Sequence, residues 1–247
     1  MASNRSSPPR TPAQLAAKSP RRAKRGPATA NTERKRLTPE DRRRQILDAA
    51  VSYFAEVGFD GGTRDLAHRL GVTQPLIYRY FPSKDDLIRQ VYEEVYLGRW
   101  RAEWEVMITD RSIPLRDRLV AFYRSYGEVI FATEWMRIYL FAGLRGLGIN
   151  RWWITFVESH VLNRICEEIR VTSKLASPQE IPIQQAELDY LWIFHGGFFY
   201  NGMRRHLYGT EPHLDLEQTI ELAVDGLLAS FPAISRRLIK SMRSDGA

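Results

Sequence analysis

A short segment near residue 75 brings together side chains that can hydrogen-bond to a nucleic acid. The sequence Gln-Pro-Leu-Ile-Tyr-Arg-Tyr at residues 74–80 carries an amide, two phenols and a guanidinium. If the segment is a helix with Ile77 on its buried side, these groups face outward. Amides and guanidinium groups pair with base edges in the major groove, whereas hydroxyls and cations contact phosphates. The pattern therefore favours contact with double-stranded DNA, although short helices around a glycine also occur in all-α cores.

Two short helices are predicted to position these side chains. Gly71 supplies the tight turn between them, where a side chain would be crowded. Thr63 is a candidate cap of the first helix, and Thr73 is a candidate cap of the second, with Pro75 tolerated in its first turn. This order predicts a helix-turn-helix whose second helix enters the major groove.

The surrounding residues resemble the tetracycline-repressor (TetR) family. The resemblance covers about residues 40–95, through Arg-Arg-Gln-Ile-Leu-Asp-Ala-Ala at 43–50, Phe-Ala-Glu-Val-Gly-Phe at 54–59, Thr-Arg-Asp-Leu-Ala at 63–67 and Tyr-Arg-Tyr-Phe-Pro-Ser-Lys-Asp-Asp-Leu at 78–87. It implies an all-helical homodimer whose paired N-terminal heads grip a palindromic operator. Carried over by position, the DNA contacts of the family fall on Thr63, Arg64, Thr73, Gln74, Pro75, Leu76, Tyr78, Tyr80 and Lys84.

The distribution of charge separates the N-terminal tail from the rest of the chain. The net charge of the 247 residues is +7, but residues 1–36 alone carry ten Lys and Arg against one acid. Residues 85–247 carry nineteen basic and twenty-two acidic residues. We therefore expect a disordered basic arm at 1–36 that is attracted to phosphates without sequence preference, or else a solvated tail.

Apolar spacing predicts helices along the remaining chain and no sheet. The first begins at Thr38 and ends at Gly58, and a fourth runs from Ser83 to about Met107. Further helices are expected at about 114–130, 134–142, 152–175, 184–207 and 215–229, with a short terminal helix from Pro232. The fold class is all-α, with about nine to ten helices. The predicted domains are a head at 37–95 and a helical body for ligand binding and dimerisation at 96–247.

The body is rich in aromatic residues, which can line an apolar pocket. Seventeen of the twenty-eight aromatic residues lie between Phe122 and Tyr208. A well-filled helical core is the alternative for any one of them. The candidate walls are Trp135, Tyr139, Trp152, Phe156, His160, Trp192, His195 and Phe199, with Trp153 and Tyr200 beside them. Histidines 160 and 195 and Arg204 are the candidate polar anchors, and the effector is expected to be small and apolar or aromatic.

Other classes of site find less support in the residues. No His, Cys or Asp pair at ligand spacing indicates a metal or cofactor, and the single Cys166 fits a reducing cytoplasm. The longest apolar run has 11 residues, too few for a membrane span. The sequence shows no nucleophile paired with a base and no phosphate-binding loop, so it does not predict an enzyme. Dimerisation is expected through the last two long helices, with Phe194, Phe198, Leu222 and Leu227 at the seam.

These observations together predict a cytoplasmic, sequence-specific regulator of transcription, with repression relieved by a small molecule. An activator of the same fold is an open alternative, because the sign of regulation depends on the position of the operator. A second alternative is an effector-independent DNA-binding adaptor, for which the body would be packed without a cavity. A third, an enzyme that uses the aromatic pocket, would need titratable groups converging in the cavity.

Overall fold

The computed structural model describes residues 37–245, with side chains as far as residue 241. Over these residues the secondary structure is helical, without strands, as the apolar spacing predicts. Residues from Leu37 onward form one compact unit, and the predicted basic arm at 1–36 lies outside the described residues. The predicted division between head and body at residue 95 stays a prediction.

The helices of the described residues are ten if contiguous segments are counted together. They are α1 (Pro39–Val57), α2 (Thr63–Leu70), α3 (Gln74–Tyr80), α4 (Lys84–Tyr92) with the π-helical turn η1 (Glu93–Leu97), α5 (Glu103–Thr109), α6 (Leu115–Ile130), α7 (Thr133–Leu144), α8 (Ile149–Val157) with the π-helical turn η2 (Glu158–Leu162) leading into α9 (Asn163–Thr172), α10 (Gln185–His206) and α11 (Leu216–Asp245).

Helix α1 begins and ends where its sequence predicts. The Thr38 hydroxyl accepts a hydrogen bond from the backbone N–H of Asp41 at 3.1 Å, and Pro39 fills the first turn. Gly58 ends the helix with a φ of 77°, a left-handed value that favours glycine. The buried side of α1 packs on α2 and α4, and its C-terminal half packs on α7.

The fourth helix is shorter than predicted. It ends at Leu97, and a separate helix α5 follows, whereas the sequence predicted one helix to about Met107. The last turn is π-helical, with Gly98 N–H bonded to Glu93 O at 2.9 Å. A Cβ at Gly98 would lie 2.7 Å from Glu94 O, so the exit from this turn requires glycine. The apolar spacing does break here, because Trp100 lies five residues after Val95.

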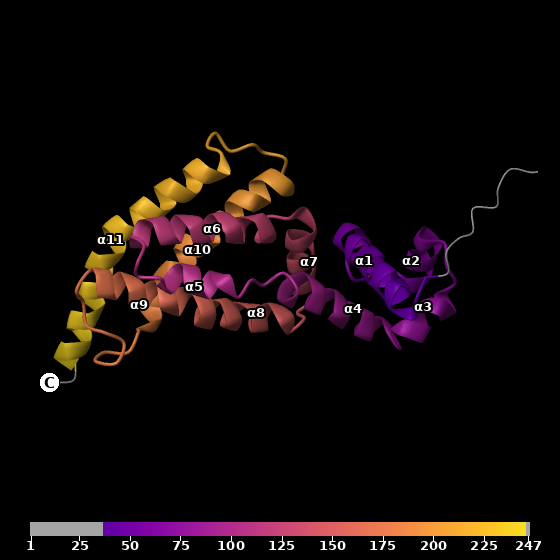
Figure 1. Ribbon diagram of the computed structural model, residues 1–247, viewed down its shortest axis with the longest axis horizontal. Helices are drawn as coiled ribbons and strands as arrows, with labels where there is room; N and C mark the ends of the chain where they lie inside the picture. Colours follow the sequence, from indigo (N-terminus) through magenta and orange to yellow (C-terminus); the bar gives the residue numbers. More distant parts are fainter. Residues whose placement is uncertain (1–36, 246–247) are drawn as a thin grey trace, which may run out of the picture. The chain divides into compact units, whose positions relative to one another are not determined.

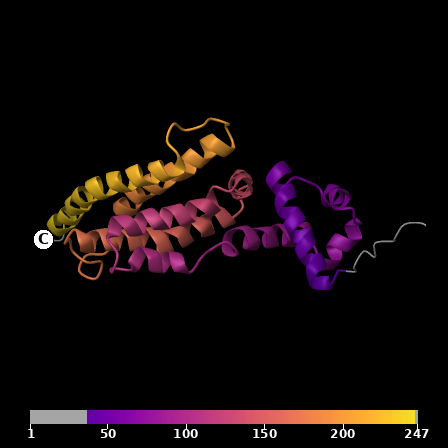
Figure 2. The same ribbon diagram turned by 45° about the horizontal axis from the view of Figure 1, so that its top comes forward.

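The C-terminal helices form a layered bundle. Figures 1 and 2 show α10 and α11 side by side, and α11 also packs on α6 and α9. Helix α11 continues through Pro232, where the sequence predicted a new helix. Proline removes one backbone hydrogen bond at a cost of about 3 kcal/mol. The buried residues Val224, Leu227 and Phe231 lead up to it and Ile239 follows it at helical spacing, so continued packing offsets that cost.

Two ion-pair networks centred on buried glutamates join the helices of the bundle, and the residue pattern predicted neither. Arg170 and Glu187 have fully buried side chains and pair with each other across α9 and α10. Arg170 also donates to Ile181 O at 2.6 Å, and the Ser235 hydroxyl donates to Glu187. These contacts fix the 173–184 loop against α9, α10 and α11. In the second network Glu168 accepts from Arg118 and Arg111, both at 2.8 Å.

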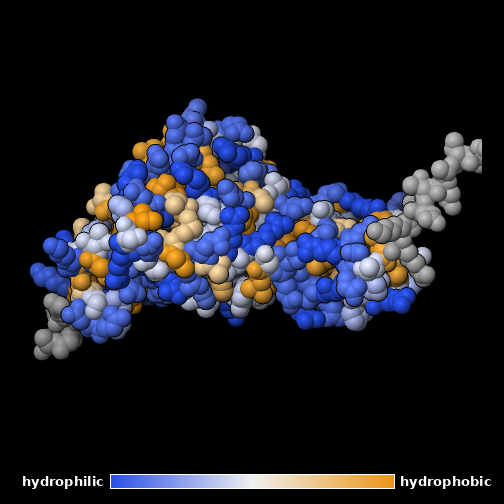
Figure 3. All heavy atoms as spheres, in the orientation of Figure 1, coloured by the Kyte–Doolittle hydropathy of each residue, from blue (hydrophilic) through white to orange (hydrophobic). Residues whose placement is uncertain are grey.

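Hydrophilic residues cover most of the face drawn in Figure 3, with hydrophobic residues interspersed among them. None of the helices between residues 37 and 245 is both long and apolar enough to span a membrane.

Candidate functional site

The turn between α2 and α3 is held by glycine geometry and one buried side chain. Gly71 has a φ of 67°, and its N–H reaches the carbonyls of Ala67 and His68. Ile77 is fully buried and anchors α3 to the head. The opposite side of α3 therefore faces away from the core, as a helix-turn-helix requires.

The predicted contact residue Thr63 is not exposed. Its side chain is buried, and its hydroxyl accepts a hydrogen bond from Gln74 Nε2 at 2.8 Å. The same hydroxyl lies 2.9 Å from the Tyr78 hydroxyl. Thr63 therefore orients Gln74 and Tyr78, two residues on the outward side of α3. It is also the first residue of α2 rather than its cap, because Gly62 occupies the cap position.

The other predicted DNA contacts keep accessible surface. Arg64, Thr73, Pro75 and Tyr78 are exposed. The remaining members are half-buried, namely Gln74, Leu76, Tyr80 and Lys84. Thr73 stands at the cap position of α3, but its side chain makes no cap hydrogen bond, contrary to the expectation. All of these residues lie on α2, α3 and their flanks, and their contact with DNA stays a prediction.

Lys84 is positioned by a well-capped start of α4. The Ser83 hydroxyl accepts from Asp86 N at 3.0 Å and donates to Asp86 Oδ2 at 2.8 Å. The hydrogen bond from Ser83 and the contact with Arg89 lower the pKa of the Asp86 carboxyl. Because the carboxylate stays charged, the cap is kept at neutral pH and fixes the first turn that carries Lys84.

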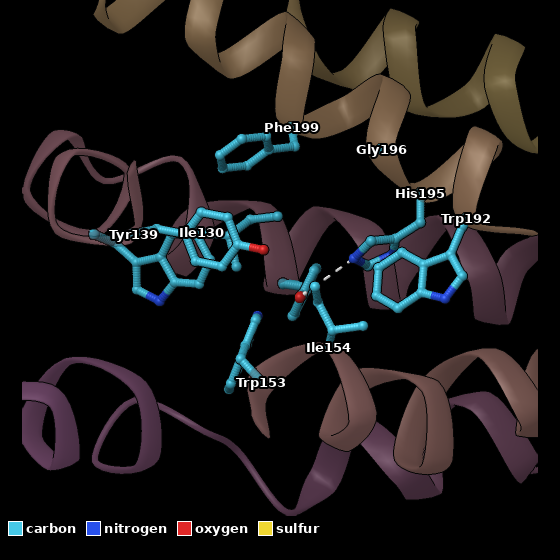
Figure 4. Close-up of a pocket in the computed structure, with 10 residues that line it drawn as sticks. Ile130, Tyr139, Trp153, Ile154, Trp192, His195, Gly196 and Phe199 are labelled. Atoms are coloured by element: carbon cyan, nitrogen blue, oxygen red, sulfur yellow. Dashed lines mark hydrogen bonds between the residues drawn. The ribbon is translucent and has the colours of Figure 1, made fainter. Parts of the chain in front are cut away.

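A cavity of about 400 Å³ lies in the body. Its walls come from α6, α7, α8 and α10, and they are mainly aromatic (Figure 4). The lining residues are Tyr126, Ile130, Trp135, Tyr139, Trp153, Ile154, Trp192, His195, Gly196 and Phe199. This volume and composition suit a drug-sized, largely apolar ligand.

Among these walls His195 and Tyr126 form a hydrogen-bonded pair, and the Tyr139 hydroxyl and the unpartnered indole N–H of Trp135 are the nearby polar groups. The His195 imidazole is bonded through Nε2 to the Tyr126 hydroxyl at 3.4 Å, the dashed line in Figure 4. Its Nδ1 lies 3.2 Å from the hydroxyl of Tyr123, which is outside the lining. Burial lowers the pKa of His195 to about 4 and raises the pKa of both tyrosines. The imidazole and both phenols are therefore neutral at pH 7. We call the end of the cavity formed by His195 and Tyr126 the polar tip, and it offers hydrogen bonds without charge.

The cavity brings together five of the eight residues predicted to bind a ligand: Trp135, Tyr139, Trp192, His195 and Phe199. Trp152, Phe156 and His160 are not lining residues, which corrects their assignment. They pack with Trp153 and Trp100 instead, and the ring centroids of Phe156 and His160 are 4.1 Å apart. The register of α8 explains this, since it turns Trp153 and Ile154 toward the cavity. Tyr200 and Arg204 also lie outside the lining.

Four lining residues were not predicted from the sequence: Tyr126, Ile130, Ile154 and Gly196. The first two lie four residues apart on α6, a helical spacing that could have been noticed. Gly196 has no side chain that could indicate a place in the lining. A Cβ there would meet nothing within 4 Å, so the glycine leaves open space at the cavity wall.

The predicted dimer residues divide into buried and accessible ones. Phe198 and Leu227 are 3% and 2% exposed and belong to the core of the chain, which corrects their assignment to a surface. Phe198 stacks on Tyr123 with ring centroids 4.7 Å apart, which explains its burial. Phe194 is half-buried against the same tyrosine, and Leu222 is 59% exposed.

Helix α7 connects the cavity to the head. Trp135 and Tyr139 lie one turn apart on its cavity side. On its other side, the Arg137 guanidinium donates to Ala55 O and, at 2.8 Å, to Glu56 O at the end of α1. A Cβ on Gly58 would lie 3.2 Å from the Phe141 ring, so α1 ends in close contact with α7.

A run of aromatic contacts leads from the head to the same cavity wall. The Phe59 ring lies 5.4 Å from that of Tyr92, and Tyr92 lies 5.8 Å from Tyr96. Tyr96, in the π-helical turn after α4, contacts Trp135 and Trp153 at 5.1 and 5.3 Å. The core of the head and the cavity therefore share a continuous set of packed rings.

Known proteins resemble the head in sequence and the described chain in fold. Residues 46–91 match the family model of bacterial regulatory proteins, tetR family. The HTH-type transcriptional activator FasR of Mycolicibacterium smegmatis is 36% identical over 80 residues, 32% of this chain and 36% of FasR. The HTH-type transcriptional regulator LuxR of Vibrio harveyi is 34% identical over 67 residues, 27% of this chain and 33% of LuxR. The chain thus spans about a third of the length of each relative.

Solved structures extend the likeness in fold beyond the head. A TetR-like transcriptional regulator from a Rhodococcus species matches with a TM-score of 0.53 and 19% identity, over 80% of this chain and 96% of that one. A tetR-family regulator from Streptomyces coelicolor matches with a TM-score of 0.55 and 16% identity, over 84% and 87%. Residues 46–91 of this chain thus match the tetR family of bacterial regulatory proteins in sequence, and the described chain shares the all-helical fold of TetR-like regulators.

Proposed function

We propose that this protein is a sequence-specific DNA-binding regulator of transcription. The observation that carries the proposal is the α2–Gly71–α3 unit, in which Ile77 anchors the recognition helix. The outward side of α3 presents Gln74, Tyr78 and Arg79. An amide and a guanidinium can read base edges, and the phenol can reach phosphates or thymine methyl groups. Lys84, at the start of α4, adds a phosphate contact.

The protein acts as a homodimer on a palindromic operator. Apolar side chains stand exposed on the two longest helices: Ile193 at 73% and Tyr200 at 58% on α10, and Leu222 at 59% on α11. A second copy of the chain can bury these exposed apolar side chains in a two-fold interface. Two recognition helices then enter successive major grooves, about 34 Å apart along the DNA.

A small apolar molecule in the cavity relieves repression. The cavity supports this part of the proposal, because an effector-independent adaptor would have a packed body instead. Helix α7 carries cavity residues on one side and Arg137 on the other, and Tyr96 packs on Trp135. A ligand that favours another arrangement of α7 or α4 changes the spacing of the two heads. The coupling requires different ligand affinities in the two states.

Activation instead of repression is the second candidate. FasR, one of the relatives, is named an activator. The same head and cavity serve both outcomes, because an operator that overlaps a promoter blocks polymerase and one placed upstream can recruit it. Transcription from the bound promoter, with and without the protein, distinguishes the two.

Footprinting on the DNA upstream of the gene itself tests the proposal, since regulators of this kind often control their neighbours. We expect protection of an inverted repeat whose half-sites lie one helical turn apart. Added cavity ligand should remove the protection. Protection that is uniform along the fragment, at a concentration equal to that required on random DNA, would refute sequence-specific binding.

A further inference from the structure

The cavity is built for a ligand without charge. Its ten lining residues include no Asp, Glu, Lys or Arg. The only lining side chains with acid or base groups are the tyrosines and His195, which burial keeps neutral at pH 7. A carboxylate or ammonium group that entered would lose its water and find no partner of opposite charge, so charged ligands are strongly disfavoured.

The walls favour a flat ring system over a flexible chain. Trp135 and Tyr139 both line the cavity and are stacked on each other, with an angle of 10° between their planes. Figure 4 shows Phe199, Trp153 and Trp192 facing the same space from other sides. Aromatic rings pack against one another by offset stacking or edge-to-face contact, both of which a planar ligand can satisfy.

At its buried end the cavity can hydrogen-bond to one oxygen atom of a ligand. A neutral imidazole has one donor and one acceptor nitrogen, and His195 is bonded to a tyrosine at each nitrogen. If Nε2 carries the proton, the Tyr126 hydroxyl is free to donate to a ligand. If Nδ1 carries it, Tyr126 donates to Nε2 and its oxygen accepts from a ligand. The pair can therefore receive either a carbonyl or a hydroxyl.

The entrance lies between α8 and α10. Ile154 is 41% exposed and Gly196 is exposed, whereas Tyr126, Trp135 and His195 are buried. A ligand that enters past Ile154 and Gly196 reaches the aromatic walls first and the polar tip last. This order places the polar end of the ligand inside and its apolar body between the walls.

We infer that the cavity binds an uncharged, flat ring system whose single hydroxyl or carbonyl oxygen faces Tyr126 and His195. The inference rests on the proposed function only in treating this molecule as the effector. The binding chemistry itself depends on the cavity residues alone.

A matched set of fluorescent probes tests the ligand class with the full-length protein at pH 7. The probes are 1-hydroxypyrene, pyrene, pyrene-1-carboxylate and 1-pyrenemethylammonium, read by quenching of tryptophan emission. We expect 1-hydroxypyrene to bind about three- to tenfold more tightly than pyrene, as one neutral hydrogen bond provides. Both charged probes should bind at least about 100-fold more weakly than 1-hydroxypyrene. Equal or tighter binding of either charged probe, or of decanol in competition, would overturn the inference.

Two tyrosine variants locate the polar tip. Tyr126→Phe should abolish the preference for 1-hydroxypyrene over pyrene and leave the affinity for pyrene within about twofold. Tyr123→Phe is the matched control, because it removes the other hydroxyl on His195 but does not line the cavity. It should keep the preference. A preference that survives Tyr126→Phe places the oxygen elsewhere and refutes the assignment.

Blocking the entrance tests whether the probes occupy this cavity. Ile154→Trp and Gly196→Leu should each weaken binding of 1-hydroxypyrene at least about tenfold. Thr155→Trp, at the exposed neighbouring position outside the lining, should not. Unchanged affinity in both blocking variants would mean that the probe binds elsewhere. Operator binding measured on the same samples separates the two claims: specific DNA binding with a charged-probe preference contradicts only the ligand class, and selective probe binding without DNA binding contradicts only the function.

Discussion

At the scale of single residues, a buried hydroxyl organises the surface that faces DNA. Thr63 bonds Gln74 and lies within hydrogen-bond distance of Tyr78, so the first residue of α2 presets two side chains of α3. The Gln74 amide retains its oxygen and a second N–H, and a bidentate pair with adenine uses one donor and one acceptor. The contact with Thr63 therefore orients the amide and leaves one donor and one acceptor for a base.

Gln74 and Lys84 should affect DNA binding in different ways. Gln74→Ala removes a base contact, so it should cost about 1–3 kcal/mol on the operator and leave random DNA unaffected. Lys84→Ala removes a phosphate contact, so it should weaken binding to every sequence and reduce the salt dependence. Fluorescence anisotropy on both DNAs at several salt concentrations measures this. An equal loss on operator and random DNA for Gln74→Ala would contradict its role.

His195 should make stability depend on pH in a defined window. Burial lowers its pKa to about 4, whereas the unfolded value is about 6.5, so the unfolded chain binds the proton more readily. The stabilisation is complete above about pH 6.5 and is lost as pH falls toward about 4. Between pH 7 and pH 5 the free energy of unfolding should fall by about 2 kcal/mol from this residue.

Urea denaturation of the wild type and of His195→Gln at pH 7 and pH 5 measures this contribution. The variant has no titrating imidazole at this position, so its loss of stability between the two pH values should be smaller by about 2 kcal/mol. An identical pH dependence of both proteins would show that His195 is not held neutral by the fold.

At the scale of the elements, α7 is the part that both the head and the cavity contact. Its two faces follow from helical spacing: Trp135 and Tyr139 lie four residues apart and reach the cavity, whereas Arg137 and Phe141 reach α1. Glu134 adds a bond from Ser52 at 2.9 Å. A ligand that moves the two aromatic residues therefore acts directly on the end of α1.

Arg137→Met should weaken the coupling between cavity and DNA. The change removes two charge-assisted hydrogen bonds to the carbonyls that end α1 and keeps most of the aliphatic packing. We expect the ratio of operator Kd with and without saturating cavity ligand to fall toward one. Arg145→Met, at the end of the same helix, is the control, since its ion pair with Asp60 is exposed. Full coupling in Arg137→Met would exclude this route.

The buried Arg170–Glu187 pair should be essential to the bundle. Burial alone would raise the pKa of Glu187, but the hydrogen bonds from Arg170 and Ser235 outweigh it and hold the pKa below its usual value. Arg170→Met leaves a buried carboxylate unpaired and should cost about 3–5 kcal/mol in the free energy of unfolding. Arg116→Met breaks the exposed pair with Asp225, which solvent screens, so it should change the free energy of unfolding far less. Denaturant midpoints that match for the two variants would contradict this difference.

The sequence predicts the start of a helix where a side chain caps that helix by a local hydrogen bond. Thr38 and Ser83 have side chains that cap a helix by local bonds, so the starts of α1 and α4 were correct. The end of α4 depends on how the π-helical turn packs Tyr96 on Trp135, a contact between distant segments. Likewise, α11 passes Pro232 because packing along the whole bundle offsets a local penalty.

The cavity was predicted only in part for a related reason. Aromatic density indicated which segments could form it, but the lining of α8 depends on rotation of that helix about its axis. Trp152 and Trp153 are neighbours in sequence, and only Trp153 faces the cavity. The place of Gly196 in the lining could not be inferred from the sequence. A glycine leaves space because it has no side chain, and that space can be recognised only once the surrounding residues are placed.

At the scale of the whole molecule, dimerisation should depend on exposed residues of α10 and α11. Leu222 is 59% exposed, and a two-fold interface would place a charge there twice, so Leu222→Glu should give monomers with poor operator affinity. Val106→Glu, at a 64% exposed position on α5, should leave the dimer intact. Sedimentation of both variants at micromolar concentration measures this, and a wild-type monomer under the same conditions would contradict the proposed dimer.

The central claim is that the α2–α3 head reads a DNA sequence, and a competition titration tests it most directly. The full-length protein is bound to the inverted repeat found by footprinting and displaced with random double-stranded DNA at one fixed, physiological salt concentration. We predict that the repeat binds at least about 1,000-fold more tightly than random DNA. Displacement by random DNA at the same concentration as by the repeat itself would contradict the account.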